Sequence, residues 1–307
     1  MPNAKDILWF KQQFHTKIEA AIQGTPFTLD MLVALACQET GEIWPILRKR
    51  PLTVDQILEL CVGDTLDSSG GRGAFPKTKA DLVAKPNGEQ MFNLARQALV
   101  DMAQHIDSYK PAATRANKFC HGFGIFQYDI QFFLEEPDYF LQKRYANFDI
   151  CLQKCIGELK HALKKIGFQN RTSLTDREMA YVAIAYNTGG FKPSRGLKQG
   201  YFDGQKYYGE QIFDFLQLSK SVSLDGGGAT QPVQPTSSLY EVQVTNTPLN
   251  LRSEPRIDPH NVKVKLPNGH RVRSVSDQQT NGFMEVETDF LGEHYRGYVS
   301  ANYLRRV

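Results

Sequence analysis

The chain has 307 residues, of which 41% are hydrophobic and 22% are charged, and its formal net charge is +3. This composition is ordinary for a globular protein, and the length allows one large domain together with a small one. So small a charge gives no support for nucleic acid as a partner, although it would not hinder approach to an anionic polymer.

The cysteines and apolar runs bear on the compartment. The five cysteines are an odd number and all precede residue 156, which argues against a disulfide framework and for core positions. Residues 1–22 have the periodicity of an amphipathic helix and carry charges, so they lack the apolar core of a signal peptide. The longest apolar run, 31–37, is too short for a membrane span. We therefore expect cytoplasmic synthesis without a visible signal peptide, and no membrane span.

Residues 28–41 predict a helix that is buried on most sides. Thr28 suits the N-cap, every residue in 31–37 is apolar, and Gly41 fits a left-handed C-cap. Glu39 shares a face with Leu35 and should emerge at the edge of the core. Desolvation and the negative end of the helix dipole would both raise its pKa, which suits a general acid. The alternative is a solvated last turn with no function.

Helical patterns account for most of the first 219 residues. Capping boxes at Thr53–Gln56 and Thr175–Glu178 each open a helix, and the second helix stops at Gly189. The segment 63–88 is rich in Gly, Ser and Pro, so we read it as a loop or a small β-wing beside the site. Apolar periodicity predicts further helices over 91–106, 145–166 and 208–216.

The composition changes after residue 219. Residues 220–238 are rich in Gly, Ser, Pro and Gln and predict a flexible linker. Residues 239–307 contain short alternating runs separated by turn sequences, which predict a small all-β module. We therefore expect a mainly-α domain over 1–219, a linker over 220–238 and a β domain over 239–307.

Three segments of the helical domain together resemble the lysozyme-like superfamily, specifically goose-type lysozymes and soluble lytic transglycosylases. They are the helix that ends in Glu39, the sequence GIFQ at 124–127, and the sequence AYNTG at 185–189. The resemblance covers roughly residues 28–190. It implies a mainly-α lysozyme-like domain of the α+β kind with a small β-wing.

The resemblance also implies roles for these residues. Glu39 would protonate the glycosidic oxygen between N-acetylmuramic acid and N-acetylglucosamine. Gly124 would let the backbone approach the sugar, and Gln127 would help to form the cleft and offer a donor and an acceptor to sugar hydroxyls. Tyr186 and Asn187 would orient the acid and contact the N-acetyl group. Alternatively, the glycines mark an ordinary turn, and the Tyr-Asn pair ends a helix with the tyrosine in the core.

The C-terminal module resembles bacterial SH3-type domains through residues 249–255, LNLRSEP, and 297–304, GYVSANYL. The resemblance implies a small all-β SH3-type barrel that binds the peptide stems of peptidoglycan. Phe283 stands where a Trp is frequent, so the ligand groove would differ. The alternative is a spacer that binds nothing.

The reaction type depends on a second carboxylate. A transglycosylase needs only the acid, whereas an inverting hydrolase needs a second carboxylate to activate water. Asp64 and Asp67 follow Glu39 at a remove similar to that in goose-type hydrolases, and Thr40 stands where transglycosylases usually have Ser. We therefore expect hydrolysis, with Asp64 preferred over Asp67 because it adjoins a predicted helix end. Alternatively, each Asp only caps or turns the chain.

Other chemistry is less well supported. Cys37 with His121 would be a nucleophile pair of the cysteine-peptidase kind, but Cys37 lies in the most apolar run, where a thiolate is disfavoured. Cys151 and Cys155 fit a core stripe better than a metal site. We expect no metal and no cofactor.

The combined expectation is a muramidase that acts in the periplasm or cell wall, with the wall of a target cell among the candidate sites of action. Its partners would be the glycan strands and peptide stems of peptidoglycan, with a secretion apparatus or an immunity protein as further candidates. The alternatives are a lytic transglycosylase, a non-catalytic wall-binding protein, and a glycosidase of chitin or chitosan. A phage lysin, an injected antibacterial effector and a wall-remodelling enzyme all fit the sequence.

Overall fold

The structure is a computed structural model that describes residues 1–66, 72–224, 238–245, 247–280, 282–290 and 293–307. The chain divides into two compact units, Met1–Asp225 and Gly226–Val307. The predicted linker 220–238 falls largely on residues 225–237, outside the described residues. Each unit has its own hydrophobic core, and each is described by itself below.

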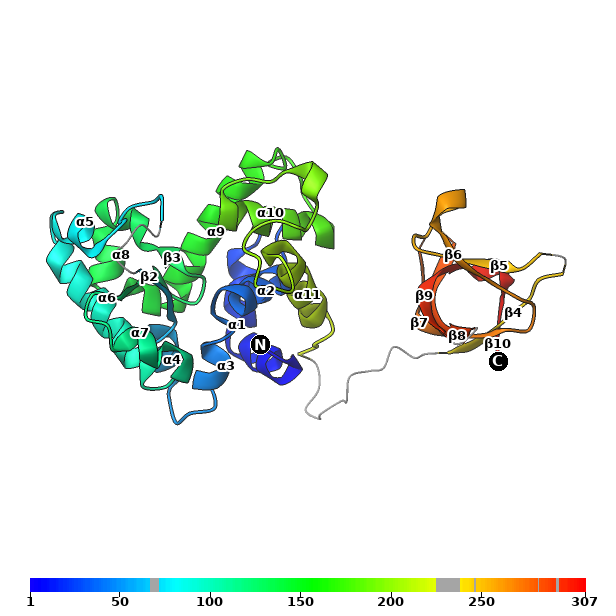
Figure 1. Cartoon of the computed structure of the whole chain (residues 1–307), viewed down its shortest axis with the longest axis horizontal. Coiled ribbons are helices and arrows are strands. Elements are labelled where there is room, and N and C mark those ends of the chain that lie inside the picture. Colours follow the sequence, from blue (N-terminus) through cyan, green and yellow to red (C-terminus); the bar gives the residue numbers. More distant parts are fainter. Residues whose placement is uncertain (67–71, 225–237, 246, 281, 291–292) are drawn as a thin grey trace. The chain divides into compact units, whose positions relative to one another are not determined.

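The first unit is mainly helical (Figure 1). Its helices are α1 (Ala4–Ala21), α2 (Leu29–Thr40), α3 (Trp44–Leu47), α4 (Val54–Glu59), α5 (Lys79–Val83), α6 (Gly88–Ala103), α7 (Lys110–Ala113), α8 (Pro137–Leu141), α9 (Phe148–Lys165), α10 (Asp176–Thr188) and α11 (Tyr208–Lys220). Its strands are β1 (Val62–Leu66), β2 (Phe119–Phe123) and β3 (Tyr128–Asp129).

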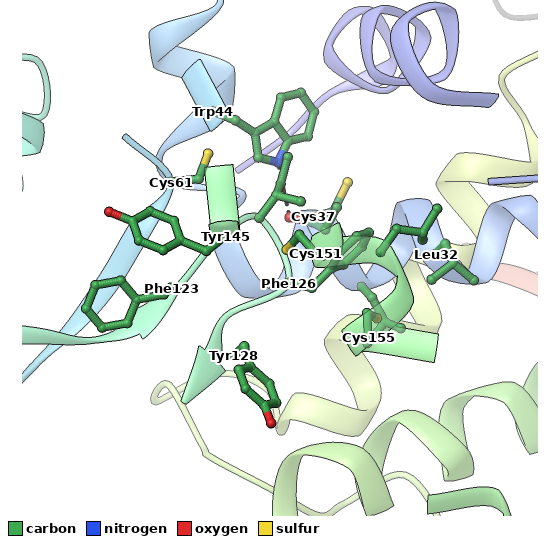
Figure 2. Close-up of a cluster of buried hydrophobic side chains, with 14 of the residues drawn as sticks. Leu32, Cys37, Trp44, Cys61, Phe123, Phe126, Tyr128, Tyr145, Cys151 and Cys155 are labelled. Carbon is green, nitrogen blue, oxygen red and sulfur yellow. Dashed lines mark hydrogen bonds between the residues drawn. The ribbon is translucent and has the colours of Figure 1, made fainter. Parts of the chain in front are cut away.

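Helix α2 lies in the core of this unit, because every side chain in 31–37 is buried. It packs against α1 and α11. Figure 2 shows Leu32 and Cys37 of α2 near Phe126, with Cys151 and Cys155 of α9 in the same cluster. A helix with this little solvent contact holds its last turn in a fixed place, which matters because Glu39 lies in that turn.

The three predicted threonine caps are confirmed, whereas the helices predicted over 91–106 and 145–166 are α6 and α9 with shifted bounds, and one predicted stop is wrong. Thr28 accepts a hydrogen bond from the backbone N–H of Met31, and both capping boxes form. Gly189 ends α10 in the left-handed conformation. Gly41, however, has φ −66°, which is right-handed. The reason for a glycine there is space, since a Cβ would lie 2.7 Å from Cγ of Pro2.

A three-stranded antiparallel sheet in the order β1-β2-β3 lies beside the helices. Gly63 pairs with Gly122, Thr65 with Cys120, and Gly122 with Asp129. Strand β1 begins the segment 63–88, which the sequence predicts to be a loop or a small β-wing. The sheet carries Asp64 on its first strand, whereas Asp67 lies outside the described residues.

The second unit is an antiparallel β structure whose strands curve around a common interior (Figure 1). Its strands are β4 (Leu239–Val242), β5 (Leu249–Arg252), β6 (Val262–Leu266), β7 (Arg271–Thr280), β8 (Phe283–Phe290), β9 (Glu293–Ser300) and β10 (Leu304–Arg306). They form one sheet in the order β10-β4-β7-β8-β9-β5-β6. The alternating residues Leu249 and Leu251 of β5 enter its core, as do Met284 and Val286 of β8.

The predicted order of a helical region followed by a β region is therefore confirmed at this coarse level. Among the described helices, none combines the length and apolar character needed to cross a bilayer.

Candidate functional site

Glu39 lies in the last turn of α2, half-buried at the edge of the core. Its carboxylate accepts a hydrogen bond of 2.8 Å from the hydroxyl of Tyr208. Burial raises the pKa of Glu39 to about 7, and the negative charge of Asp64 acts in the same direction. The Tyr208 hydrogen bond partly opposes these effects because it favours the anion. Glu39 is therefore divided between its protonated and ionised forms near neutral pH, as general acid–base catalysis requires.

Tyr208 lies next to Glu39 in the structure, whereas the sequence pattern indicated only that it begins the predicted helix 208–216. It is buried, it begins α11, and its backbone N–H donates to the carbonyl of Tyr201. The contact with Glu39 spans 169 residues of sequence. No local pattern signals such a contact, because it depends on how α11 packs against α2.

Thr40 joins the acid's helix to the glycine-rich turn. Its buried hydroxyl donates to the carbonyl of Ile125 at 2.8 Å. Gly124 in that turn has φ +80°, and a Cβ there would lie 2.6 Å from the sulfur of Cys151. Gly124 thus allows the turn to pack against α9. The turn is fixed to both helices before any ligand binds.

The amide N–H groups of Gln127 form hydrogen bonds with backbone carbonyls of the protein. Its amide nitrogen donates to the carbonyl of Gly124 at 2.7 Å and to that of Cys61 at 3.4 Å. Its amide oxygen faces Gly63 and Gly122, where a Cβ would lie 2.6 and 2.2 Å away. The side chain lines the cleft described below. The carbonyls of Gly124 and Cys61 use both N–H donors of its amide.

Tyr186 and Asn187 lie at the end of α10, on the other side of the acid. The hydroxyl of Tyr186 donates to the carbonyl of Phe126 at 2.7 Å, which ties α10 to the glycine-rich turn. Asn187 is exposed and has no hydrogen bond to Glu39 among the contacts of the described residues. The hydroxyl that reaches the acid is thus that of Tyr208, while the side chain of Asn187 is open to a ligand.

Polar side chains of the three-stranded sheet form the opposite wall. Asp64 has φ 42° and a side chain that is 73% exposed. His121 lies between Asp64 and Asp129, with its Nε2 3.9 Å from Asp64 and its Nδ1 3.1 Å from Asp129. Arg72 in turn contacts both oxygens of Asp129. Burial opposes ionisation of Asp129, but the hydrogen bonds from His121 and Arg72 outweigh it and lower the pKa.

Glu39 and Asp64 line the same cleft, which has a volume of about 200 Å³. Its lining includes most of the predicted site residues, namely Glu39, Asp64, Gln127, Tyr186 and Asn187. Gly124 does not line it; the glycine that does is Gly122. A cleft with an acid of pKa about 7 on one wall and an exposed carboxylate on the other can bind a polar chain and deliver a proton to it.

The described parts of the chain give little support for a metal site or for a reactive cysteine. No group of three or more His, Cys, Asp or Glu side chains in those parts could hold a metal ion. All five cysteines belong to the described residues and are free and buried. Burial raises the pKa of the Cys37 thiol, which disfavours the nucleophile proposed for it with His121.

The second unit has a larger groove of about 850 Å³. Amide side chains line it, among them Asn250, Asn268 and Asn302, together with the exposed apolar residues Ile257 and Tyr303. Phe283 is 9% exposed and also lines the groove. This mixture of amides and apolar surface suits a peptide better than a charged polymer.

Comparisons of the chain with protein-family models, with curated proteins and with solved structures gave no match.

Proposed function

We propose that the chain is a peptidoglycan N-acetylmuramidase that hydrolyses the β-1,4 bond between N-acetylmuramic acid and N-acetylglucosamine. The observation that carries the proposal is the position of Glu39, half-buried with a pKa of about 7, in a cleft that also holds Asp64. The identity of the sugars rests on the resemblance of three sequence segments to lysozyme-like enzymes. Asn187, exposed in the same cleft, is the residue that would contact an N-acetyl group.

In this scheme Glu39 gives its proton to the glycosidic oxygen as the bond from that oxygen to the anomeric carbon breaks. Asp64 takes a proton from a water molecule, whose oxygen bonds to the anomeric carbon from the opposite face of the sugar. Glu39 is then ionised and Asp64 protonated, and exchange with solvent restores both. Asp67 stays the alternative second carboxylate because it lies outside the described residues.

The second unit supports a targeting role. We propose that its groove holds the enzyme on the wall by binding peptide stems. The amide side chains can pair with peptide groups, and Tyr303 offers exposed aromatic surface at the rim. The enzyme would thus act in the periplasm or cell wall.

Substitutions in the cleft test the catalytic proposal. Glu39→Gln keeps the volume of the side chain but cannot give up a proton, and Asp64→Asn cannot accept one from water. Each should lower the turnover of purified peptidoglycan by about 10²–10⁴-fold. The matched control is Glu42→Gln, an exposed glutamate outside the cleft, which should keep wild-type turnover.

A folded Glu39→Gln protein with wild-type turnover would contradict the role of the acid. Full activity in Asp64→Asn, with anhydro sugar products, would make the protein a lytic transglycosylase. A wild-type protein that binds sacculi without cleaving them would be a wall-binding protein.

A further inference from the structure

His121 is a half-buried polar residue of β2 that lies beside two carboxylates lining the cleft, and the catalytic scheme gives it no role. Its position follows from the sheet register. Gly63 pairs with Gly122 and Thr65 with Cys120, so Asp64 and His121 are direct neighbours across β1 and β2. Cross-strand neighbours point their side chains to the same face of a sheet. The two ring nitrogens of His121 each lie near a carboxylate oxygen, Nε2 at 3.9 Å from Asp64 and Nδ1 at 3.1 Å from Asp129.

The far side of the ring is held firmly. Asp129 accepts the hydrogen bond from Nδ1 of His121 at 3.1 Å. The Arg72 guanidinium contacts the same carboxylate twice, at 2.9 and 2.6 Å, in the bidentate geometry that fixes both partners. The side chains of Arg72, His121 and Asp129 are 16%, 20% and 24% exposed, so water competes little for these contacts.

The near side of the ring faces a carboxylate that needs a support. Asp64 is mostly exposed, and its backbone is in the left-handed region, which is unusual for a strand residue other than glycine. The distance of 3.9 Å to Nε2 of His121 is too long for a direct hydrogen bond but within the range of an ion pair. Since Nδ1 carries the hydrogen donated to Asp129, Nε2 has a hydrogen to direct at Asp64 in the imidazolium form of the ring.

We infer that His121 is a positioning residue that holds Asp64 toward the cleft. With the imidazole protonated, the four side chains alternate in charge, from Asp64 through His121 and Asp129 to Arg72. Attraction to the imidazolium restricts the rotamers of an otherwise free carboxylate, and Asp129 with Arg72 fixes where the imidazolium lies. This inference rests on the proposed function, in which Asp64 activates water.

A double-mutant cycle tests the inference on the full-length protein. The variants are His121→Gln, Asp64→Asn and the combination, and kcat and KM are measured on a soluble tetrasaccharide prepared from peptidoglycan. His121→Gln alone should lower kcat about tenfold to a hundredfold, because a misplaced catalytic group costs rate more than binding. KM should change by less than about twofold. In the Asp64→Asn background, His121→Gln should change kcat by less than about twofold.

Two further variants separate positioning from folding. His260→Gln makes the same substitution at an exposed site in the second unit and should leave kcat unchanged. Asp129→Ala removes the acceptor of the Nδ1 hydrogen bond and leaves the imidazole itself unchanged, and its effect should also vanish in the Asp64→Asn background. If His121→Gln strongly lowers the melting temperature, the cycle of the Asp129 variant with Asp64→Asn decides whether the ring positions Asp64.

Three results would contradict the account. Equal losses from His121→Gln with and without Asp64 would make His121 a structural residue of the sheet, and wild-type kcat in His121→Gln would leave it without a role. Either result overturns the inference and leaves the muramidase proposal intact. A wild-type protein that releases no new reducing ends would instead overturn the proposed function, and the inference with it.

Discussion

Tyr208 acts on Glu39 in the direction opposite to burial. Burial in the cleft raises the pKa of the acid to about 7, and the hydrogen bond from the tyrosine hydroxyl works in the lowering direction because it stabilises the carboxylate. A general acid is active in its protonated form, so the rate should fall as the pH rises through this pKa. In the proposed muramidase, the alkaline limit of activity would thus depend on Glu39 and on Tyr208, which are distant in sequence.

We predict that Tyr208→Phe moves the alkaline limb of the kcat/KM profile to higher pH. Loss of the hydroxyl removes a hydrogen bond that favours the anion, so the pKa of Glu39 rises, by on the order of one unit. The measurement is the rate of peptidoglycan cleavage across the pH range. Tyr181→Phe is the matched control, because this half-buried tyrosine of α10 does not line the cleft. A limb that stays in place or moves to lower pH would contradict the assignment.

Among the elements, the glycine-rich turn shows how packing constrains the site. Gly124 and Gly167 have the same φ of +80°, but their surroundings differ. A Cβ at Gly124 would lie 2.6 Å from the sulfur of Cys151 and 3.0 Å from the carbonyl oxygen of Tyr145, whereas Gly167 has nothing within 4 Å. Comparing substitutions at Gly124 and Gly167 therefore distinguishes the cost of backbone strain from the cost of steric overlap.

We predict that Gly124→Ala lowers the free energy of unfolding by about 2–5 kcal/mol, the sum of left-handed strain and overpacking. Gly167→Ala should cost only the strain, about 1–2 kcal/mol. Denaturant unfolding of both variants measures the difference. Equal costs at the two positions would show that the turn does not pack against α9 as described.

The sequence predicted the helix starts of this unit better than the contacts between helices. Thr28, Thr53 and Thr175 are caps whose partners lie within three residues, so local chemistry determines them. The left-handed conformation predicted for Gly41 was wrong; a Cβ there would lie 2.0 Å from the carbonyl oxygen of Cys37 and 2.7 Å from the side chain of Pro2, which packs here from another part of the chain. The role of Tyr208 was missed for the same reason.

For the candidate site, as for the helices, the sequence pointed to individual residues but not to the contacts between distant ones. Glu39 was singled out because a carboxylate at the end of an apolar helix is a local pattern, and Asp64 because its distance in sequence from Glu39 is similar to that in goose-type hydrolases. The Asp64–His121 neighbourhood depends on the register of β1 and β2, which no sequence period fixes. His121 was therefore considered only as a partner for Cys37.

The whole molecule consists of two units with separate cores, and this separation gives the proposal its second test. We predict that deleting residues 239–307 weakens binding to intact sacculi but preserves cleavage of soluble glycan fragments. The groove residues are lost, whereas Glu39, Tyr208 and Asp64 all belong to the first unit. Co-sedimentation with sacculi and turnover of soluble fragments measure the two effects.

The matched point variant is Tyr303→Ala, which removes an exposed aromatic side chain from the groove. It should reproduce the loss of binding without truncating the chain. Equal loss of activity on sacculi and on soluble fragments after the deletion would show that the second unit contributes to the active site or to stability.

The reaction type is the central claim of the account, and cleavage of purified peptidoglycan in water enriched in ¹⁸O tests it most directly. Hydrolysis places one oxygen from water at each new reducing end, whereas a transglycosylase closes the sugar on its own 6-hydroxyl and takes up none. We predict muramic acid ends that carry the heavy oxygen in mass spectra of the wild-type products, and no such products from Glu39→Gln. Unlabelled 1,6-anhydromuramic ends from the wild-type protein would contradict the account.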